Sequence, residues 1–268
     1  MTEIFQDIRK TYNFFRPVEL ADFVEFYGET CDAKTELFLK GQAYTIKMFP
    51  SWTPTFYINL GRSYKMSIGK QLFHIRRESD VLILRDRITE RFNHPDDHIF
   101  ITKFYPGGLE SVLGMRQSEM TEPVYDLRQV LPPVLIQQIK TAACFQDRVK
   151  ILNAHLLSCC TKRAVNDHYI KMIHASVSSY MDSGMLLNTS ELAERHFLSS
   201  KTINRYFQRK IGVSPKKYFS VLRARTALID WVQDPGKFDP CDYGYYDRSH
   251  FQKEVVRFTE ARLPPALL

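Results

Sequence analysis

The stretch from Ser199 to Arg225 contains eight basic residues and not a single Asp or Glu. Ile203, Phe207 and Ile211 recur within it at every fourth position, which predicts one apolar face of a helix. The first part of the stretch, up to Ile211, is therefore expected to fold as an amphipathic helix that packs on a core through one face. The basic residues are Lys201, Arg205, Arg209, Lys210, Lys216, Lys217, Arg223 and Arg225.

A second face of the same helix is polar. Lys201, Asn204, Arg205 and Gln208 follow at i, i+3, i+4 and i+7, and Arg209 comes next. Arg and Lys can pair with guanine acceptors, and Asn and Gln with adenine, so these side chains suit the base edges of DNA. The alternative is an ordinary solvated helix face, which is what most charged runs are.

The neighbouring residues favour the DNA interpretation. Asn188 to Glu191 offers an N-cap with an acid three residues on, and a short helix follows that ends by Phe197. Gly212 suits a helix stop, and Ser214-Pro215 suits a cap followed by proline at the first helical position. The next helix is expected from about Lys216 to Val232. This order is typical of a helix-turn-helix unit followed by a long supporting helix.

Four motifs together resemble the AraC-type bacterial transcription regulators. They are LA at 192–193, S...I.R.F at 199–207, G.SP..Y at 212–218 and R..TAL at 223–228. The resemblance implies an all-α DNA-binding domain with two helix-turn-helix units joined by the long helix. It implies that the polar face named above enters the major groove, and we expect Lys216 and Lys217 to contact phosphates.

The second unit is expected in GYYDRSHFQKEVVRFT, from 244 to 259. Asp247 is the expected N-cap, and Phe251, Val255 and Phe258 form an apolar stripe. By resemblance, the residues that face the groove are Arg248, Ser249, Gln252 and Lys253.

This second unit departs from the family pattern at three places. Its leading helix is compressed into FDPCDY, in which Pro240 is tolerable only at a helix start. Val255 and Val256 replace a common aromatic and basic pair, and Glu260 replaces the usual glycine. We infer that the second unit binds DNA more weakly than the first or mainly supports it.

The first 130 residues have a different character. AYTIKMF, TFYINL, QLFHIRR, SDVLILRD and HIFITKFY are short aromatic and β-branched segments between turn residues, which predicts a mostly-β domain. The family resemblance, supported by RPVELADFVEFY at 16–27, implies a cupin-like barrel here. The expected fold is α+β with a β-rich ligand-sensing or assembly domain at 1–131, a helical linker at 132–163 and the AraC-type DNA-binding domain at 164–268.

Two amphipathic patterns lie between the β segments and the first helix-turn-helix unit. Phe145, Val149, Leu152 and Leu156 predict a helix that serves either dimerisation or bracing within one chain, with bracing slightly favoured. The run from Val165 to Tyr180 predicts the first helix of the DNA-binding domain.

Charge agrees with a nucleic-acid partner. The net charge is +7, and residues 161–268 hold 17 Lys and Arg against 11 Asp and Glu, so the basic excess lies in that half.

No apolar run approaches the roughly twenty residues that span a bilayer, and the first residues lack the apolar stretch of a signal peptide. We therefore expect a cytoplasmic protein without a membrane partner. The five cysteines show no paired zinc spacing and are expected to be reduced thiols.

Cupin-like folds often hold metals through histidines, so an enzyme is the alternative. His94-Pro-Asp-Asp-His98 could clasp a cation, with His74 also in this region, but Pro95 and the acids favour a surface turn. No nucleophile elbow, phosphate-cradling glycine loop or helical zinc motif occurs. We expect no catalytic residue, metal or cofactor.

Two hypotheses follow. The first is a sequence-specific transcription regulator that reads double-stranded DNA with two recognition helices, the first dominant; its further expected partners are RNA polymerase, a small-molecule effector and a second copy of the chain. The second is a cupin-like metalloenzyme or small-molecule binding module with an accessory DNA-binding tail.

Overall fold

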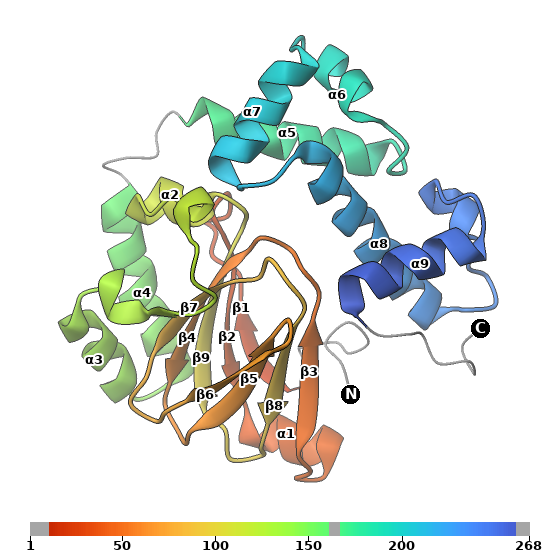
Figure 1. The fold of residues 1–268 in the computed structure, drawn as a ribbon. Coiled ribbons are helices and arrows are strands. Elements are labelled where there is room, and N and C mark those ends of the chain that lie inside the picture. Colours follow the sequence, from red (N-terminus) through yellow and green to blue (C-terminus); the bar gives the residue numbers. More distant parts are fainter. Residues whose placement is uncertain (1–10, 161–166, 261–268) are drawn as a thin grey trace.

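The computed structural model describes residues 11–160 and 167–260. A β-sheet domain comes first and a helical part follows it (Figure 1). This order confirms the expected fold class. The boundary expected at 163–164, and Val165 of the predicted first helix, lie outside the described residues.

The strands of the β domain form two antiparallel sheets. One sheet has the order β1-β2-β9-β4-β7-β10 and the other β3-β8-β5-β6, a double-sheet layout of the kind cupins have. The strands are β1 (Tyr12–Phe15), β2 (Val24–Thr30), β3 (Tyr44–Met48), β4 (Pro54–Asn59), β5 (Tyr64–Ile68), β6 (Gln71–Ile75), β7 (Val81–Leu84), β8 (Thr89–Asn93), β9 (Ile99–Phe104) and β10 (Tyr125–Asp126). Each of the five predicted segments contains a strand, whereas β1, β2, β5, β8 and β10 were not predicted.

The interior between the sheets is apolar. Tyr57 and Ile83 of the larger sheet and Met66 of the smaller belong to one buried cluster. Every residue of β4 and β9 is buried, because the larger sheet is covered on both faces.

Helices cover the outer face of the larger sheet (Figure 1). Phe145, Leu152 and Leu156 pack in one cluster with Phe100 and Phe104 of β9. The region expected to be a helical linker therefore lies against the β domain, as the bracing alternative predicts. The helical elements of this half are α1 (Asp32–Leu39), α2 (Gly108–Leu113), η3 (Gln117–Glu119), η4 (Leu127–Gln129), α3 (Pro133–Thr141) and α4 (Phe145–Cys160).

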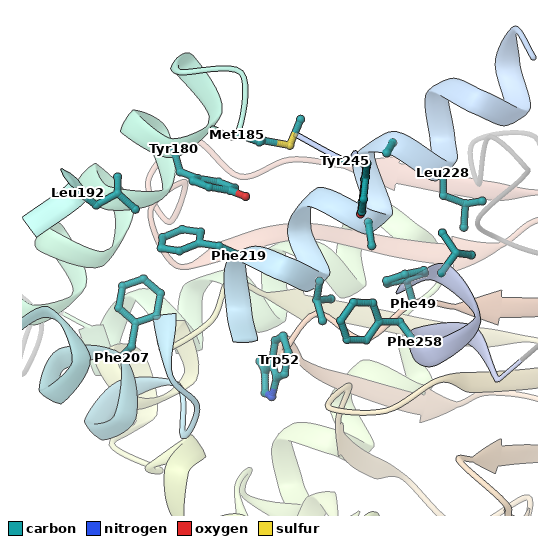
Figure 2. Packing of buried hydrophobic residues seen from close by; sticks show 14 of the residues in the cluster. Phe49, Trp52, Tyr180, Met185, Leu192, Phe207, Phe219, Leu228, Tyr245 and Phe258 are labelled. Carbon is teal, nitrogen blue, oxygen red and sulfur yellow. The ribbon is translucent and has the colours of Figure 1, made fainter. Parts of the chain in front are cut away.

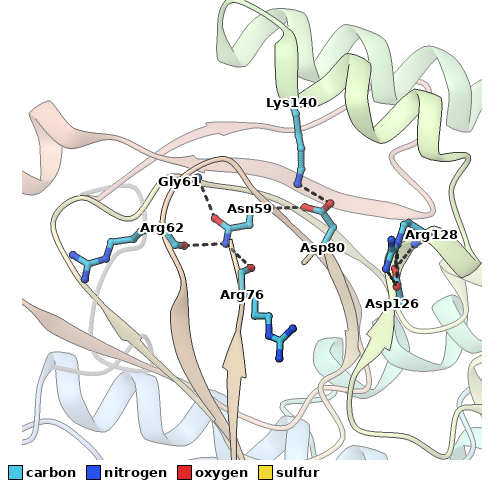
Figure 3. Close-up of polar contacts among 8 residues, drawn as sticks. All are labelled: Asn59, Gly61, Arg62, Arg76, Asp80, Asp126, Arg128 and Lys140. Carbon is cyan, nitrogen blue, oxygen red and sulfur yellow. Dashed lines mark hydrogen bonds and ion pairs between the residues drawn. The ribbon is translucent and has the colours of Figure 1, made fainter. Parts of the chain in front are cut away.

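An ion pair fixes α3 to the larger sheet (Figure 3). Lys140 Nζ lies 2.8 Å from Asp80 Oδ2, and Asp80 Oδ1 accepts a hydrogen bond from the backbone N–H of Asn59. The Asn59 amide in turn donates to the carbonyl oxygens of Arg62 and Arg76. These contacts join α3, β4 and the loops that follow β4 and β6.

The helical part consists of α5 (His168–Asp182), α6 (Thr189–Arg195), α7 (Ser200–Lys210), α8 (Pro215–Gln233), η5 (Pro240–Tyr243) and α9 (Arg248–Thr259). The long helix predicted from about Lys216 to Val232 is α8. Its buried residues, among them Phe219, Leu228 and Trp231, form a common core with the other helices. Over residues 11–160 and 167–260, no helix has the length and apolar composition to cross a bilayer.

Candidate DNA-binding interface

The capping signals expected before the first recognition helix are present. Asn188 Oδ1 accepts from the N–H groups of Ser190 and Glu191, and the Glu191 carboxylate accepts from the N–H of Asn188 at 2.7 Å. This reciprocal capping box starts α6. Ser199 then caps α7 by accepting from the N–H of Thr202 at 3.1 Å.

Helix α7 has the two faces that the sequence predicts. Ile203, Phe207 and Ile211 are buried in the helical core. The side chains on the opposite face are exposed, and they are Lys201, Asn204, Arg205, Gln208 and Arg209. Two of them lie over aromatic rings, Arg205 over Tyr206 at 5.8 Å and Arg209 over Tyr169 of α5 at 4.8 Å. These cation–π contacts hold part of the polar face in place.

The start of α8 carries two further exposed basic residues. Lys216 and Lys217 are both exposed, and Ser214 Oγ accepts from the N–H of Lys217 at 3.3 Å. The free N–H groups and positive dipole of a helix start add to the attraction of two lysines for an anion.

The second unit is built with fewer supporting elements. A four-residue 3-10 turn, η5, stands where the first unit has the helix α6. Asp247 caps α9 by accepting from the N–H of His250 at 2.7 Å. Of the side chains expected to face the groove, Arg248, Ser249 and Lys253 are exposed and Gln252 is half-buried.

Lys210 is one of the eight basic residues between Ser199 and Arg225, but it is not part of the exposed surface. Only 5% of this residue is exposed, and its ammonium lies 2.7 Å from Glu110 of α2 and 2.6 Å from Asp167. Arg223 is engaged in a similar way, because its guanidinium pairs with Glu254 of α9 at 2.8 Å and lies over the Tyr245 ring. Both residues connect parts of the fold, and neither role has a local sequence signal.

A buried amide joins the β domain to the end of α7. Gln117 of η3 is 1% exposed. Its side-chain N–H group donates to the carbonyl oxygens of Trp52 and Ile211, at 2.9 and 3.2 Å, and its side-chain oxygen accepts from the N–H of Gly107. A Cβ at Gly107 would lie 2.3 Å from Ile170 of α5, so glycine permits this close approach.

Aromatic residues extend the contact between the β domain and the helices. Phe49 and Trp52 lie in the apolar core of the helical part (Figure 2). The Trp52 ring centroid is 5.8 Å from that of Tyr218, and the Phe49 centroid is 6.1 Å from that of Phe258. The β domain thus contacts α8 and α9 as well as α7.

A cavity of about 200 Å³ lies at this contact. Its lining includes Trp52, Tyr105, Tyr218 and two charged residues, Glu25 and Arg225. Glu25 pairs at 2.8 Å with Lys103, a buried residue of β9. Burial lowers the pKa of Lys103 to about 8, although Glu25 opposes the shift. Burial alone would raise the pKa of Glu25, but Lys103 outweighs it and the pKa is lowered.

The two histidines of the candidate metal loop are engaged elsewhere. His94 Nδ1 lies 3.2 Å from Asp96 Oδ2 of the same turn, which the backbone N–H of His94 closes by donating to Asp97, whereas His98 Nε2 lies 3.0 Å from Glu29 Oε1 of β2. His74 is exposed on β6 of the smaller sheet. Within the ranges 11–160 and 167–260, no group of three or more His, Cys, Asp or Glu side chains is placed to hold a metal ion.

No protein-family model and no curated protein matches the sequence. Among solved structures, ToxT from Vibrio cholerae is similar with a TM-score of 0.44 at 10% identity, over 84% of this chain and 97% of ToxT. A ToxT structure with a bound unsaturated fatty acid gives 0.42 at 12% identity, over 84% and 94%. The AraC-like transcriptional activator CuxR gives 0.33 at 10% identity, over 84% and 92%.

Proposed function

We propose that the chain is a sequence-specific transcription regulator of the AraC type that binds double-stranded DNA. The observation that carries this proposal is the division of α7 into a buried apolar face and an exposed face of Lys, Asn, Arg and Gln side chains. Such a helix, which follows a short capped helix across a tight turn, has the form of a recognition helix in the major groove.

The exposed residues have different roles in this proposal. Lys201, Asn204, Arg205 and Gln208 read base edges, whereas Arg209, stacked on Tyr169, supports the helix at the phosphates. Lys216 and Lys217 contact phosphates near the start of α8. Arg248, Ser249, Gln252 and Lys253 of α9 make a second, weaker set of contacts.

Selection from a pool of random DNA duplexes tests the function. The purified chain should retain a recurrent sequence, and Lys201→Ala should weaken binding to that sequence. Lys150→Ala is the matched control, because this lysine of α4 is 78% exposed and lies outside the helical part. Retention of no recurrent sequence would contradict the proposal.

Salt dependence separates the two classes of contact. Each phosphate contact contributes a slope of about −0.9 to log K against log salt concentration. Lys216→Ala and Lys217→Ala should reduce that slope and weaken all duplexes alike. Lys201→Ala should instead flatten the sequence preference.

We infer that the β domain senses a small molecule or mediates assembly, without chemistry. The cavity beside Trp52 and Tyr218 is where an effector would change the contact between the β domain and α8. Trp52 fluorescence and the melting temperature should respond to such a compound. We propose that the DNA-bound chain changes transcription through RNA polymerase. A homodimer of the chain would bind two paired DNA sites. The chain and the polymerase would meet in the bacterial cytoplasm, where the DNA lies.

A metal assay tests the enzyme alternative. About one metal ion per chain, lost in His94→Ala or His98→Ala, would favour the metalloenzyme with a DNA-binding tail. Metal content unaffected by these substitutions would speak against the histidine loop.

A further inference from the structure

Phe197 has a backbone conformation that favours glycine. Its φ is 55°, in the left-handed region. The N–H of Phe197 donates to the carbonyl of Glu194, and the N–H of Leu198 donates to that of Ala193 at 2.8 Å. This is a Schellman motif, and its left-handed position is usually glycine because a Cβ there is strained. The chain itself uses Gly212, at φ 88°, where α7 ends.

The phenyl ring of Phe197 does not pack in the core. At 98% it is the most exposed of the large hydrophobic residues over 11–160 and 167–260. Packing therefore offers no compensation for the strained backbone. A strained residue that the fold does not need is a candidate for a functional contact.

The place of Phe197 in the chain indicates the partner. It precedes Ser199, the N-cap of α7, by two residues, and so lies at the same end of α7 as Lys201. Figure 1 shows the turn between α6 and α7 at the outer end of the helical part, away from the sheets. In helix-turn-helix proteins the first helix crosses the DNA backbone and the N-terminal residues of the second contact bases. The turn between them thus lies at the edge of the major groove.

We propose that the Phe197 ring contacts the C5 methyl group of a thymine at the edge of the DNA segment read by α7. This inference rests on the proposed DNA-binding function. The thymine methyl is the apolar group that the major groove presents, and a phenyl ring is among the side chains that contact it. Lys201 and Arg205, on the adjacent turns of α7, would pair with the bases that follow.

Deoxyuridine substitution tests the contact, because deoxyuridine lacks only that methyl group. Each thymine of the selected duplex is replaced in turn, and binding is measured for the unmodified chain and for Phe197→Ala. Replacement of one thymine should weaken the unmodified chain about fourfold, the value of one buried methyl group. Phe197→Ala should bind the thymine duplex about fourfold more weakly and show no further loss with deoxyuridine. Phe197→Tyr, which keeps the ring, should retain the preference for thymine.

A second variant separates the ring from the backbone. Phe197→Gly removes the ring and the strain together, whereas Phe197→Ala removes only the ring. Both should lose the thymine preference, but Phe197→Gly alone should raise the melting temperature, by about 2 °C or more. Leu72→Ala is the control, since this 51% exposed residue of β6 lies outside the helical part and does not have a positive φ.

Several results would overturn the proposal. One is an equal deoxyuridine penalty at every position in the unmodified chain and in Phe197→Ala. Another is full affinity of Phe197→Ala together with lost transcriptional activation, which would assign the ring to a protein partner. A uniform loss without any methyl dependence would assign it to the sugar-phosphate backbone. If the unmodified chain retains no DNA sequence at all, the proposed DNA-binding function is wrong. The melting temperature of Phe197→Gly would then still show whether Phe197 strains the backbone.

Discussion

The two helices proposed to recognise DNA, α7 and α9, are alike in length and differ in their support. Helix α7 has 11 residues and α9 has 12. A seven-residue helix with a capping box precedes α7, but only a four-residue 3-10 turn precedes α9. The sequences of α7 and α9 alone would predict two units of more similar strength in DNA binding. The two units are distinguished by the element that precedes and orients each helix, α6 in the first and η5 in the second.

The units also differ in their connection to the β domain. The end of α7 is fixed to the β domain by Lys210, which pairs with Glu110, and by Gln117 of the β domain, whose side chain donates to the Ile211 carbonyl. The corresponding ion pair of α9, between Arg223 and Glu254, stays within the helical part. Although Phe49 of the β domain also contacts Phe258 of α9, the ion pair and the amide should transmit a change in the β domain more strongly to the first unit than to the second.

Breaking the Lys210 contact should have the largest effect. Lys210→Met leaves the half-buried carboxylates of Glu110 and Asp167 without their cation, and we expect the free energy of unfolding to fall by about 3 kcal/mol. Arg223→Met should cost less, because it leaves a single carboxylate. Urea denaturation measures both. Adding Glu110→Gln and Asp167→Asn to Lys210→Met should recover most of the lost free energy of unfolding. If Lys210→Met and Arg223→Met lower the free energy of unfolding equally, the two units do not differ in this connection.

Base reading should come next in size. Arg205→Ala should weaken binding to the selected duplex by about 1–3 kcal/mol if the guanidinium pairs with a base. Titration with fluorescent DNA measures the loss, and Arg62→Ala, an exposed arginine of the β domain, is the control. Unchanged affinity of Arg205→Ala would mean that α7 does not present this face to the groove.

Acidification should lower the free energy of unfolding by a smaller amount, through a histidine at the contact between α5 and the β domain. His174 of α5 packs edge-on against Tyr105 of the β domain, and burial lowers its pKa although Asp22 opposes the shift. Because the unfolded chain binds the proton at a higher pH than the folded chain, the free energy of unfolding should decrease as the pH falls below about 6.5. Denaturation from pH 7.5 to 5 measures this slope. His174→Gln should flatten it, and an unaltered slope would assign the effect to other groups.

Mismatches opposite α9 should have the smallest effect. Each mismatch in the segment read by α7 is expected to cost about 1–3 kcal/mol, and those facing Arg248, Gln252 and Lys253 less than about 1 kcal/mol. A scan of all positions in the selected duplex provides the comparison. Equal or greater penalties opposite α9 would show that η5 orients its recognition helix as well as α6 does.

Local signals in the sequence predict much of the helical part. The caps at Asn188 and Ser214, and the stop at Gly212, each depend on residues a few positions apart, so the start of α6 was indicated and α8 was placed within one residue at each end. The polar face of α7 follows from the same local periodicity. The shortened η5 follows from Pro240.

Two of the strands that were not predicted, β2 and β8, contain buried polar groups. Strand β8 holds Arg91, 2% exposed, and β2 holds Glu29, 6% exposed, so neither shows the apolar alternation that marks a strand. The contacts of Lys210 and Gln117 could not be predicted either. Their partners lie about a hundred residues away in the chain, and no local pattern encodes such a distance.

Helix α8 has a consequence for the spacing of binding sites in a genome. Its 19 residues form a rod of about 28 Å between the two units, somewhat less than the rise of one DNA turn of about 34 Å. A rod of fixed length cannot follow an insertion in the DNA. Each base pair added between the two segments would turn the outer one by about 35° around the duplex axis, as follows from 10–10.5 base pairs per turn. Promoters served by both units should therefore share one spacing, and an insertion of five base pairs would place the second segment on the opposite side of the duplex.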